Sequence, residues 1–326
     1  MYYNRTLTKE FSQLIEKGGH LRWLFNFVKK NDDLDFLIGR NNNNEWVSIY
    51  RGLSRILTIH PRKRNNMILK IDADKAYKSI KNDIYGIKSL PLFFEKELKS
   101  LISGITKNKK FDGDYKNEKE GYYQNELSRL FGICGNSTSD FVIIDKEVVI
   151  GYQNKTEKQK ICVVKSKKYK KLLNSLSKYN SKRFGKNLQN KSVGNELDFL
   201  ALDKKGNILL IEYKHGTNTS GIYLSPFQIG MYYDLFKKLP MNDLQNAVFE
   251  MLSQKKKIGL INSDWVTPKT IKKIIPVLII SNYNYKSSAK VKYREVLKFL
   301  RASKGNNFLK NIKTLNYTSS AGLTPW

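Results

Sequence analysis

Two acidic residues and a lysine lie at the ends of two apolar runs within residues 194–216. Asp198 begins one apolar run, and Glu212 and Lys214 end the next. Neighbouring carboxylates repel each other, and burial raises that cost, so a divalent cation between them is favoured. Carboxylate oxygens suit Mg²⁺, and a nearby lysine can stabilise charge that develops on a phosphate. These residue types therefore indicate metal-assisted hydrolysis of a phosphodiester bond.

A β-hairpin must hold these side chains together. Gly206 ends a short turn between the two apolar runs, where a three-residue loop needs positive φ. This loop pairs Asp203 with Asn207, and counting outward places Asp198 opposite Glu212. Because side chains alternate across a strand, both carboxylates are expected on one face of the sheet.

The open end of the hairpin gathers the ionisable residues. Lys214 shares the face of the two carboxylates and lies opposite Glu196 in the same register. The rest of the hairpin is apolar on both faces, which predicts burial within a sheet. The alternative is that Glu212 and Lys214 are ordinary strand charges, since a Glu-x-Lys triplet alone is common.

The surrounding pattern predicts an α/β protein of the α+β kind, with a mixed sheet and flanking helices in its C-terminal part. A polar stretch, residues 106–121, is the best linker, so we expect an N-terminal α+β region, 1–110, and a second domain, 111–326. The expected helices are 5–30 with a break at Gly18-Gly19, 73–105, 122–132, a lysine-rich helix within 165–191, 226–239 and 291–303. The expected strands are 34–39, 45–52, 54–60, a strand-turn-strand over 139–153, the hairpin, and 274–281.

A strongly basic composition points to a polyanionic partner. The chain has 59 Lys and Arg against 29 Asp and Glu, a formal charge of +30. Such a field attracts nucleic acid first and anionic membrane second. The alternative is coding bias, because Lys, Asn, Ile and Tyr are all abundant. The basic side chains of the lysine-rich helix either form a solvated face or contact the phosphates of a nucleic acid. The candidates for phosphate contact are Lys167, Lys168, Lys170, Lys171, Lys178, Lys182 and Arg183.

Other classes of protein are disfavoured. Cys134 and Cys162 cannot form a disulfide framework or a four-cysteine zinc site, and three scattered histidines do not suggest a histidine-rich metal site. The N-terminal segment lacks an apolar signal core, and the aliphatic run at 274–280 is too short to span a bilayer. We expect a cytoplasmic protein with no membrane partner.

The acidic hairpin also resembles a known family. Asp198, followed by Glu212-Tyr213-Lys214 at the end of the next strand, is similar to the motif of the PD-(D/E)xK nuclease superfamily, although Leu197 stands in place of the proline. The following segment, 228–232, resembles the Q-h-x-x-Y motif of RecB-like members through Gln228 and Tyr232, which share one helical face. The resemblance implies a restriction-endonuclease-like core over roughly residues 120–281.

The resemblance assigns roles to individual residues. It implies that Asp198, Glu212 and Lys214 are catalytic, that Asp198 and Glu212 bind metal together with an acid on the preceding helix, and that Gln228 and Tyr232 support them. Glu126 is the candidate for that acid, with Glu118 and Glu120 as rivals. Glu196 either assists or pairs with Lys214, and His215 is either a phosphate contact or a loop residue.

The expected activity is that of an endodeoxyribonuclease that depends on Mg²⁺, with Mn²⁺ as a substitute, in restriction or anti-phage defence. DNA is the expected partner, and RNA is an alternative substrate. The N-terminal region would recognise DNA or form an oligomer, and a homodimer fits enzymes that cut both strands. The alternatives are a structure-specific repair or recombination nuclease, suggested by Gln228 and Tyr232, and a non-catalytic nucleic-acid-binding protein with a nuclease-like core.

Overall fold

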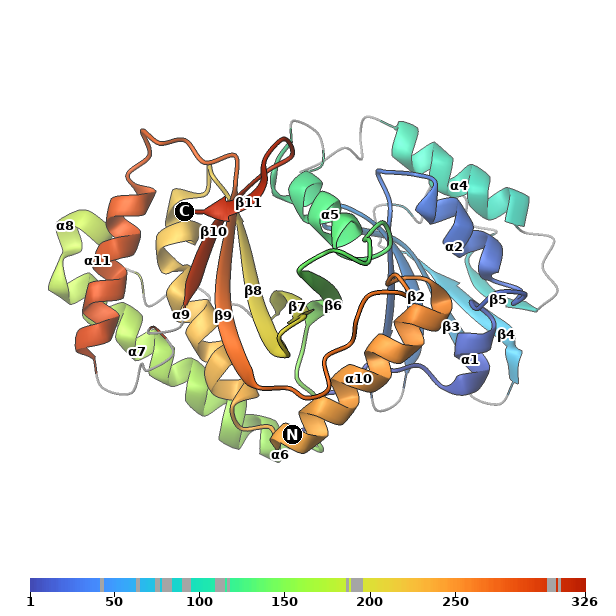
Figure 1. Ribbon diagram of the computed structural model, residues 1–326, viewed down its shortest axis with the longest axis horizontal. Coiled ribbons are helices and arrows are strands. Elements are labelled where there is room, and N and C mark those ends of the chain that lie inside the picture. Colours follow the sequence, from blue (N-terminus) through green and yellow to red (C-terminus); the bar gives the residue numbers. More distant parts are fainter. Residues whose placement is uncertain are drawn as a thin grey trace. The chain divides into compact units, whose positions relative to one another are not determined.

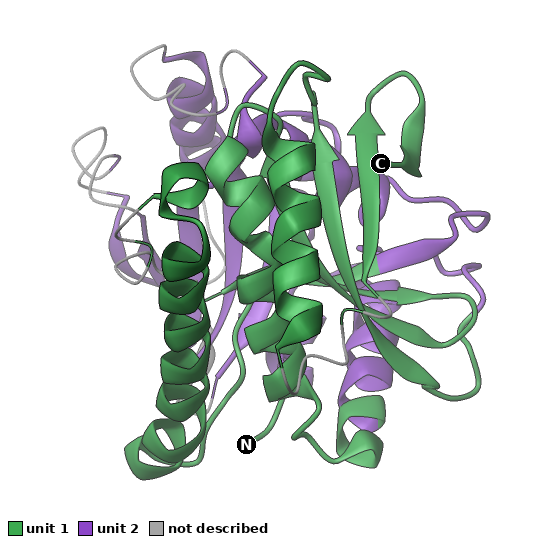
Figure 2. Ribbon diagram, turned by 90° about the vertical axis from the view of Figure 1, so that its left-hand side faces the viewer, with its two compact units in different colours: residues 1–3, 143–245, 267–326 green, residues 4–142, 246–266 purple. Residues whose placement is uncertain are grey.

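The computed structural model is a mixed α/β protein with one antiparallel and one mixed sheet. It describes all residues except 42–43, 63–64, 74–76, 78–83, 90–94, 109–114, 116–117, 186–187, 189–195, 304–308 and 310–311. The chain forms two compact units, unit 1 (residues 1–3, 143–245 and 267–326) and unit 2 (residues 4–142 and 246–266), which Figure 2 colours separately. This division differs from a single cut near residue 110, because 111–142 and 246–266 cluster with the N-terminal strands. Half of the expected linker, 106–121, lies outside the described residues.

Unit 2 contains the antiparallel sheet, in the order β1-β2-β3-β4-β5. Its strands are β1 Asp35–Arg40, β2 Glu45–Arg51, β3 Ser54–Arg62, β4 Asn65–Asp72 and β5 Gly86–Ser89. Its helices are α1 Lys9–Gln13, α2 Arg22–Lys29, α4 Glu95–Lys107 and α5 Glu120–Leu130. Apolar side chains from β1 to β4 and from α1, α2 and α4 contribute to one buried cluster. The expected helical break is confirmed, with Gly18 at φ +88° between α1 and α2.

Unit 1 contains the mixed sheet, in the order β11-β10-β9-β8-β7-β6 (Figure 1). Its strands are β6 Phe141–Val148, β7 Leu197–Asp203, β8 Asn207–His215, β9 Lys273–Ser281, β10 Lys313–Thr318 and β11 Gly322–Pro325. The β7–β8 and β10–β11 pairs are antiparallel, whereas β8–β9 and β9–β10 are parallel. Strand β8 therefore has a neighbour on each side and is almost wholly buried, as its continuous apolar run predicts.

Helices cover one face of this sheet. They are α6 Lys155–Lys158, the π-helical turn η2 Gln159–Val163, α7 Val164–Tyr179, α8 Ser181–Phe184, α9 Thr219–Phe236 and α11 Ala289–Ala302. Helix α9 packs on β7, β8 and β9, with α7 and α11 beside it (Figure 1). Helix α10 Met241–Ile258 starts in unit 1 and continues into unit 2. Within the described residues, no helix is long and apolar enough to cross a membrane.

The turn of the hairpin follows the predicted chemistry. Gly206 has φ +83°, and a Cβ atom there would lie 2.2 Å from the carbonyl oxygen of Thr270. The Asp203 carboxylate accepts hydrogen bonds from the backbone N–H groups of Lys205, at 3.0 Å, and Asn207, at 2.7 Å. The predicted register is confirmed, since Leu202 pairs with Ile208 and Leu200 with Leu210.

Four sequence expectations were wrong in detail. Residues 139–153 hold one strand, β6, rather than two, and residue 151 makes only an isolated bridge to Tyr2. The span 73–105 includes the strand β5, and the C-terminal tail adds β10 and β11 to the sheet. Helix α9 begins at Thr219 rather than near Pro226, which lies inside it.

Candidate active site

The end of the hairpin brings Asp198, Glu212 and Lys214 together. In the register of β7 and β8, the positions next to the Phe199–Ile211 pair are Asp198 and Glu212. Lys214 Nζ donates a hydrogen bond to Glu212 Oε1 and lies 3.7 Å from Asp198 Oδ2. The catalytic residues expected from the sequence therefore form one contiguous cluster within unit 1.

Burial sets the electrostatics of this cluster. The Glu212 side chain is 0% exposed, Lys214 is 12% exposed and Asp198 is 21% exposed. Burying a carboxylate without an opposite charge is costly, so the ammonium group of Lys214 compensates Glu212 in this structure. Asp198 Oδ2 is also held by the backbone N–H of Tyr213, at 2.7 Å.

Oxygen atoms from three adjacent residues converge on one cationic position. Besides its contacts with the two carboxylates, Lys214 Nζ donates a 2.7 Å hydrogen bond to the carbonyl oxygen of Tyr213. Two carboxylates and a carbonyl are hard oxygen donors, the kind that Mg²⁺ binds while it keeps part of its water shell. The donor set therefore fits Mg²⁺, provided that the flexible lysine side chain moves aside.

The protein ligands for such an ion are few. No group of three or more His, Cys, Asp or Glu residues placed to hold a metal occurs in the part of the chain that the structure describes. A metal here would be bound by Asp198, Glu212, the Tyr213 carbonyl and water. Mg²⁺ commonly takes only one or two carboxylates from a protein, so this set is sufficient in kind.

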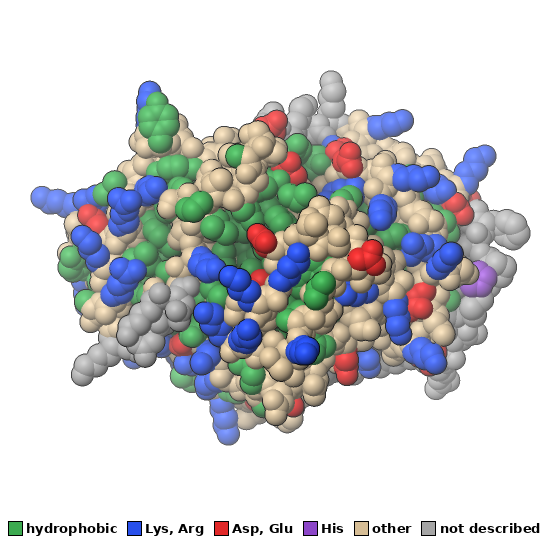
Figure 3. Space-filling view, viewed as in Figure 1, with side chains coloured by type: hydrophobic (Ala, Val, Ile, Leu, Met, Phe, Trp, Pro, Cys, Tyr) green, Lys and Arg blue, Asp and Glu red, His purple; other side chains and the backbone are tan. Residues whose placement is uncertain are grey.

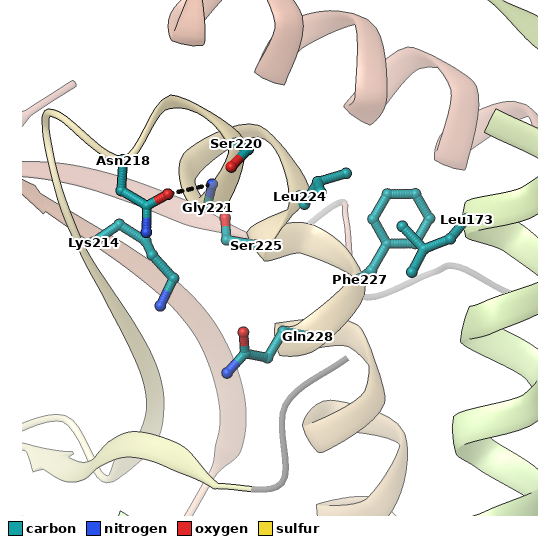
Figure 4. A pocket seen from close by; sticks show the side chains of 9 residues that line it. All are labelled: Leu173, Lys214, Asn218, Ser220, Gly221, Leu224, Ser225, Phe227 and Gln228. Carbon is teal, nitrogen blue, oxygen red and sulfur yellow. Dashed lines mark hydrogen bonds between the residues drawn. The ribbon is translucent and has the colours of Figure 1, made fainter. Parts of the chain in front are cut away.

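Helix α9 presents a second row of polar groups to the hairpin. The Asn218 carboxamide caps the helix by accepting a 2.8 Å hydrogen bond from the Gly221 N–H. Further along, Gln228 Nε2 donates to the carbonyl oxygen of Glu196, at 3.4 Å. A pocket of about 230 Å³ lies between these groups and Lys214, and in Figure 4 the Lys214 and Gln228 side chains extend toward the same space.

A buried serine explains why α9 tolerates an internal proline. Pro226 has no N–H, so the carbonyl of Ile222 loses its helical hydrogen bond. The hydroxyl of Ser225 donates to that carbonyl at 2.8 Å and replaces the missing bond. The helix therefore begins at Thr219, upstream of the expected start at 226, and extends far enough to place Lys214 beside its first turns.

Tyr232 lies one helical turn beyond Gln228 and belongs to the same site. Its side chain is 2% exposed, and its hydroxyl has no hydrogen-bond partner among the described residues. Burial raises its pKa well above the usual value, and the nearby carboxylates of Glu212, Glu196 and Asp198 raise it further. The hydroxyl therefore stays protonated and can donate a hydrogen bond close to the cluster.

The candidate acids on the preceding helix belong to unit 2. Glu126 is on α5, which belongs to unit 2, and its charge raises the pKa of Tyr122 on the same helix. Its rival Glu120 begins α5, and Glu118 accepts a 3.3 Å hydrogen bond from the hydroxyl of Tyr123. Helix α5 packs with β1 and β2 within unit 2, and the role of Glu126 as a metal ligand stays a prediction.

The predicted basic surface is partly neutralised. Asp234 on α9 lies 3.0 Å from both Lys165 Nζ and Lys168 Nζ, and Arg183 lies 2.8 Å from Glu295. The other five candidates are exposed, namely Lys167, Lys170, Lys171, Lys178 and Lys182. On the face drawn in Figure 3, Lys and Arg side chains are spread widely rather than gathered in one patch.

Several contributors to the site had no clear signal in the sequence. The Asn218 cap could have been found from its position before a helical run, but Pro226 suggested a later start. The backbone N–H of Tyr213 and the hydroxyl of Ser225 act through geometry alone. His215 is buried and its Nδ1 lies 2.8 Å from the hydroxyl of Thr217, so it holds the loop that leads from β8 to α9.

Comparisons with known proteins identify no relative. No protein family model, curated protein or solved structure matches the chain.

Proposed function

We propose that this chain is a Mg²⁺-dependent endodeoxyribonuclease with its active site at the end of the β7–β8 hairpin. The observation that carries the proposal is the convergence of Asp198, Glu212 and the Tyr213 carbonyl on one position, which the ammonium group of Lys214 occupies. A structural ion pair needs one carboxylate for one lysine. Here a second carboxylate and a carbonyl share the same lysine at a strand end where Asp198 is partly exposed, so that a phosphate can approach.

The residues divide the chemistry between them. When bound, Mg²⁺ would supply an activated water and would neutralise charge on the phosphate. Asp198 and Glu212 hold the ion, and Lys214, released from Glu212, orients the attacking water and stabilises the developing charge. Gln228 and Tyr232 offer donors from α9 that can position the phosphodiester backbone.

The biological setting is part of the proposal. The charge of +30 favours a nucleic acid as substrate, and DNA is the polymer that we propose. The mixed sheet with α9 on its face is compatible with a restriction-endonuclease-like core, and a role in restriction or anti-phage defence in the cytoplasm would follow. Mn²⁺ is expected to replace Mg²⁺, and a homodimer would allow cleavage of both strands.

Plasmid cleavage tests the catalytic site. Purified protein is incubated with supercoiled plasmid in Mg²⁺, in Mn²⁺ and in EDTA, and nicked and linear products are resolved on a gel. Lys214→Met should lower the rate at least a hundredfold, because a transition-state donor of this kind contributes about 10²–10³ in rate. Asp198→Asn should lower the rate as strongly, because it removes a ligand of the ion that activates water. Lys205→Ala, an exposed change in the same hairpin, is the matched control and should cut like the wild type. Cleavage that persists in EDTA and in both site variants contradicts the assignment.

Two alternatives predict other outcomes of the same assay. A repair or recombination nuclease, which the Gln228–Tyr232 pair on α9 favours, would cut linear, flapped or branched DNA and leave a closed circle intact. A non-catalytic binding protein would bind DNA in a salt-dependent way without cutting DNA or RNA.

A further inference from the structure

A second and larger pocket lies beside the candidate active site, within unit 1. Its volume is about 530 Å³, which falls in the range of about 300–1,000 Å³ that is usual for sites binding small organic groups. Its walls come from the segment after β6, from η2 and α7, and from α9. The lining residues with polar or aromatic character include Tyr152, Lys158, Lys167, Lys170, Glu196 and Tyr232.

Two residues connect this pocket to the hairpin cluster. Glu196 and Tyr232 line the pocket, and both belong to the group of side chains around Asp198 and Glu212. Gln228, one helical turn before Tyr232, lines the smaller pocket that contains Lys214. The two pockets therefore adjoin the same cluster. A nucleic-acid strand with one phosphate beside Lys214 could place the adjacent nucleotide in the larger pocket.

The charge at the pocket suits a phosphate. Lys158, Lys167 and Lys170 line it and are exposed, against the single carboxylate of Glu196. Within the described parts of the chain, neither Lys167 nor Lys170 forms an ion pair. This contrasts with Lys165 and Lys168 on the same helix, which Asp234 neutralises. The two lysines that face the pocket thus keep their full charge for a ligand.

The floor of the pocket suits a flat, largely apolar group. Met231 and Leu235 on α9 and Ile150 line it, together with the ring of Tyr152. Aromatic and thioether side chains provide stacking and dispersion contacts for an unsaturated ring without selecting one base. A base that is paired inside a duplex cannot enter such a pocket, whereas an unstacked base can.

We propose that this pocket binds one unpaired nucleotide of the substrate, with its base against Tyr152 and Met231 and its phosphate against Lys167 and Lys170. The location of that nucleotide next to the scissile phosphate rests on the proposed nuclease function. The substrate is then DNA with an unpaired or extruded nucleotide at the cleavage position, and a single strand binds more tightly than a perfect duplex of equal length.

Binding measured without cleavage tests the pocket. The full chain is titrated in EDTA with a fluorescently labelled oligodeoxythymidylate of eight nucleotides, and anisotropy is recorded. Lys167→Ala/Lys170→Ala and Met231→Trp, which fills the pocket, should each weaken binding about tenfold, since stacking of one base contributes about 1–3 kcal/mol. Lys171→Ala/Lys178→Ala removes the same charge from exposed positions of α7 outside the pocket lining and is the matched control.

The comparison of the two lysine pairs decides the outcome. Equal losses for the pocket pair and the control pair would show that α7 attracts DNA only through diffuse charge, and would overturn the proposal. Met231→Trp adds bulk at a residue that is 2% exposed, so the melting temperature of this variant is measured first. If the Met231→Trp variant does not fold, the comparison of the two lysine pairs still tests the pocket. An affinity for a duplex of eight base pairs that equals or exceeds that for the single strand would also contradict the pocket.

Failure of the pocket and failure of the nuclease proposal are separable. Plasmid or oligonucleotide cleavage that survives both pocket changes leaves the hairpin site intact and refutes the nucleotide pocket. Pocket-dependent binding by a protein that cuts no substrate supports the pocket as a nucleotide site and refutes the nuclease.

Discussion

Replacement of Lys214 by alanine tests the electrostatics on which the candidate site depends. The change removes the ammonium group that contacts Glu212, whose side chain is 0% exposed, and that lies 3.7 Å from Asp198 Oδ2. Removing one partner of a buried ion pair costs about 3–5 kcal/mol, because the remaining charge stays uncompensated. Asp198 is 21% exposed and can be hydrated, so we expect the lower end of this range, about 3 kcal/mol.

The expected loss can be measured by thermal unfolding. For a folding unit of this size, about 1 kcal/mol corresponds to about 2–4 °C in melting temperature, so Lys214→Ala should lower it by about 6–12 °C in EDTA. Lys205→Ala, exposed in the turn of the same hairpin, should change the free energy of unfolding by no more than about 0.5 kcal/mol. Circular dichroism of both variants and the wild type gives the comparison.

Metal should reverse the loss. An ion bound by Asp198, Glu212 and the Tyr213 carbonyl takes over the role of the missing lysine. At a Mg²⁺ concentration about one hundred times its Kd, binding to the folded state adds about 2.7 kcal/mol, which offsets most of the cost of Lys214→Ala. Glu212→Gln should abolish the response to Mg²⁺.

Two results would refute this reasoning. If Lys214→Ala and the Lys205→Ala control have the same melting temperature, Glu212 is not a buried charge that Lys214 compensates. If Lys214→Ala loses stability but Mg²⁺ restores none of it, while Glu212→Gln/Lys214→Ala is more stable than Lys214→Ala alone, the cluster is a structural ion pair and the metal site is wrong. The double variant isolates the coupling between the two residues.

Three further predictions concern the elements that position the site and the stability of unit 2. Ser225→Ala should destabilise the protein by about 1–3 kcal/mol in urea unfolding, because the buried Ile222 carbonyl beside Pro226 loses its only replacement donor among the described residues. Asn218→Ala should cost about 1 kcal/mol in the same assay through loss of the helix cap at the Gly221 N–H. Burial lowers the pKa of His60 below its usual 6.5, so the unfolded state binds more protons as pH falls through 6.5, and the stability of unit 2 should decrease over that interval. In His60→Gln the slope of unfolding free energy between pH 7.5 and 5.5 should be flatter, and an unchanged slope would show that another group controls it.

The central hairpin was predictable because its constraints are local. Gly206 sets the turn, and strict alternation on both sides of it sets the register, so a one-residue slip would reverse the face of every side chain. The predicted pairs Leu202–Ile208 and Leu200–Leu210 are those of the structure. Local signals also predicted the break between α1 and α2, from Gly18-Gly19, and the buried strand β9, from its apolar run.

The start of α9 was not predictable from local signals. Pro226 is typical of a first helical turn, and the sequence preceding it contains no strong helix-forming pattern. The helix continues upstream because the Ser225 hydroxyl replaces the bond that the proline removes and because Asn218 caps it. Both contributions are visible only once the backbone path is known. The result is that polar groups on the first turns of α9 lie beside Lys214.

The third acid stays a prediction, and the packing of its helix had no signal in the sequence. Glu126 lies on α5, which packs with β1 and β2 of unit 2. Arg129 on that helix donates hydrogen bonds to the backbone carbonyls of Val28 and Leu34, at 3.1 and 2.6 Å. Tertiary packing of this kind overrides order along the chain, and no spacing rule reveals it.

The cluster at the hairpin is better explained by function than by stability. A lysine that compensates a single buried glutamate would satisfy the fold, and apolar residues of similar size often stabilise a protein as well or better. Here Asp198 is added next to Glu212, and the Tyr213 carbonyl points to the same position. Each addition raises the demand for positive charge at one point. Residues that increase the local cost of folding while they concentrate oxygen donors are expected where a cation and a phosphate must be bound.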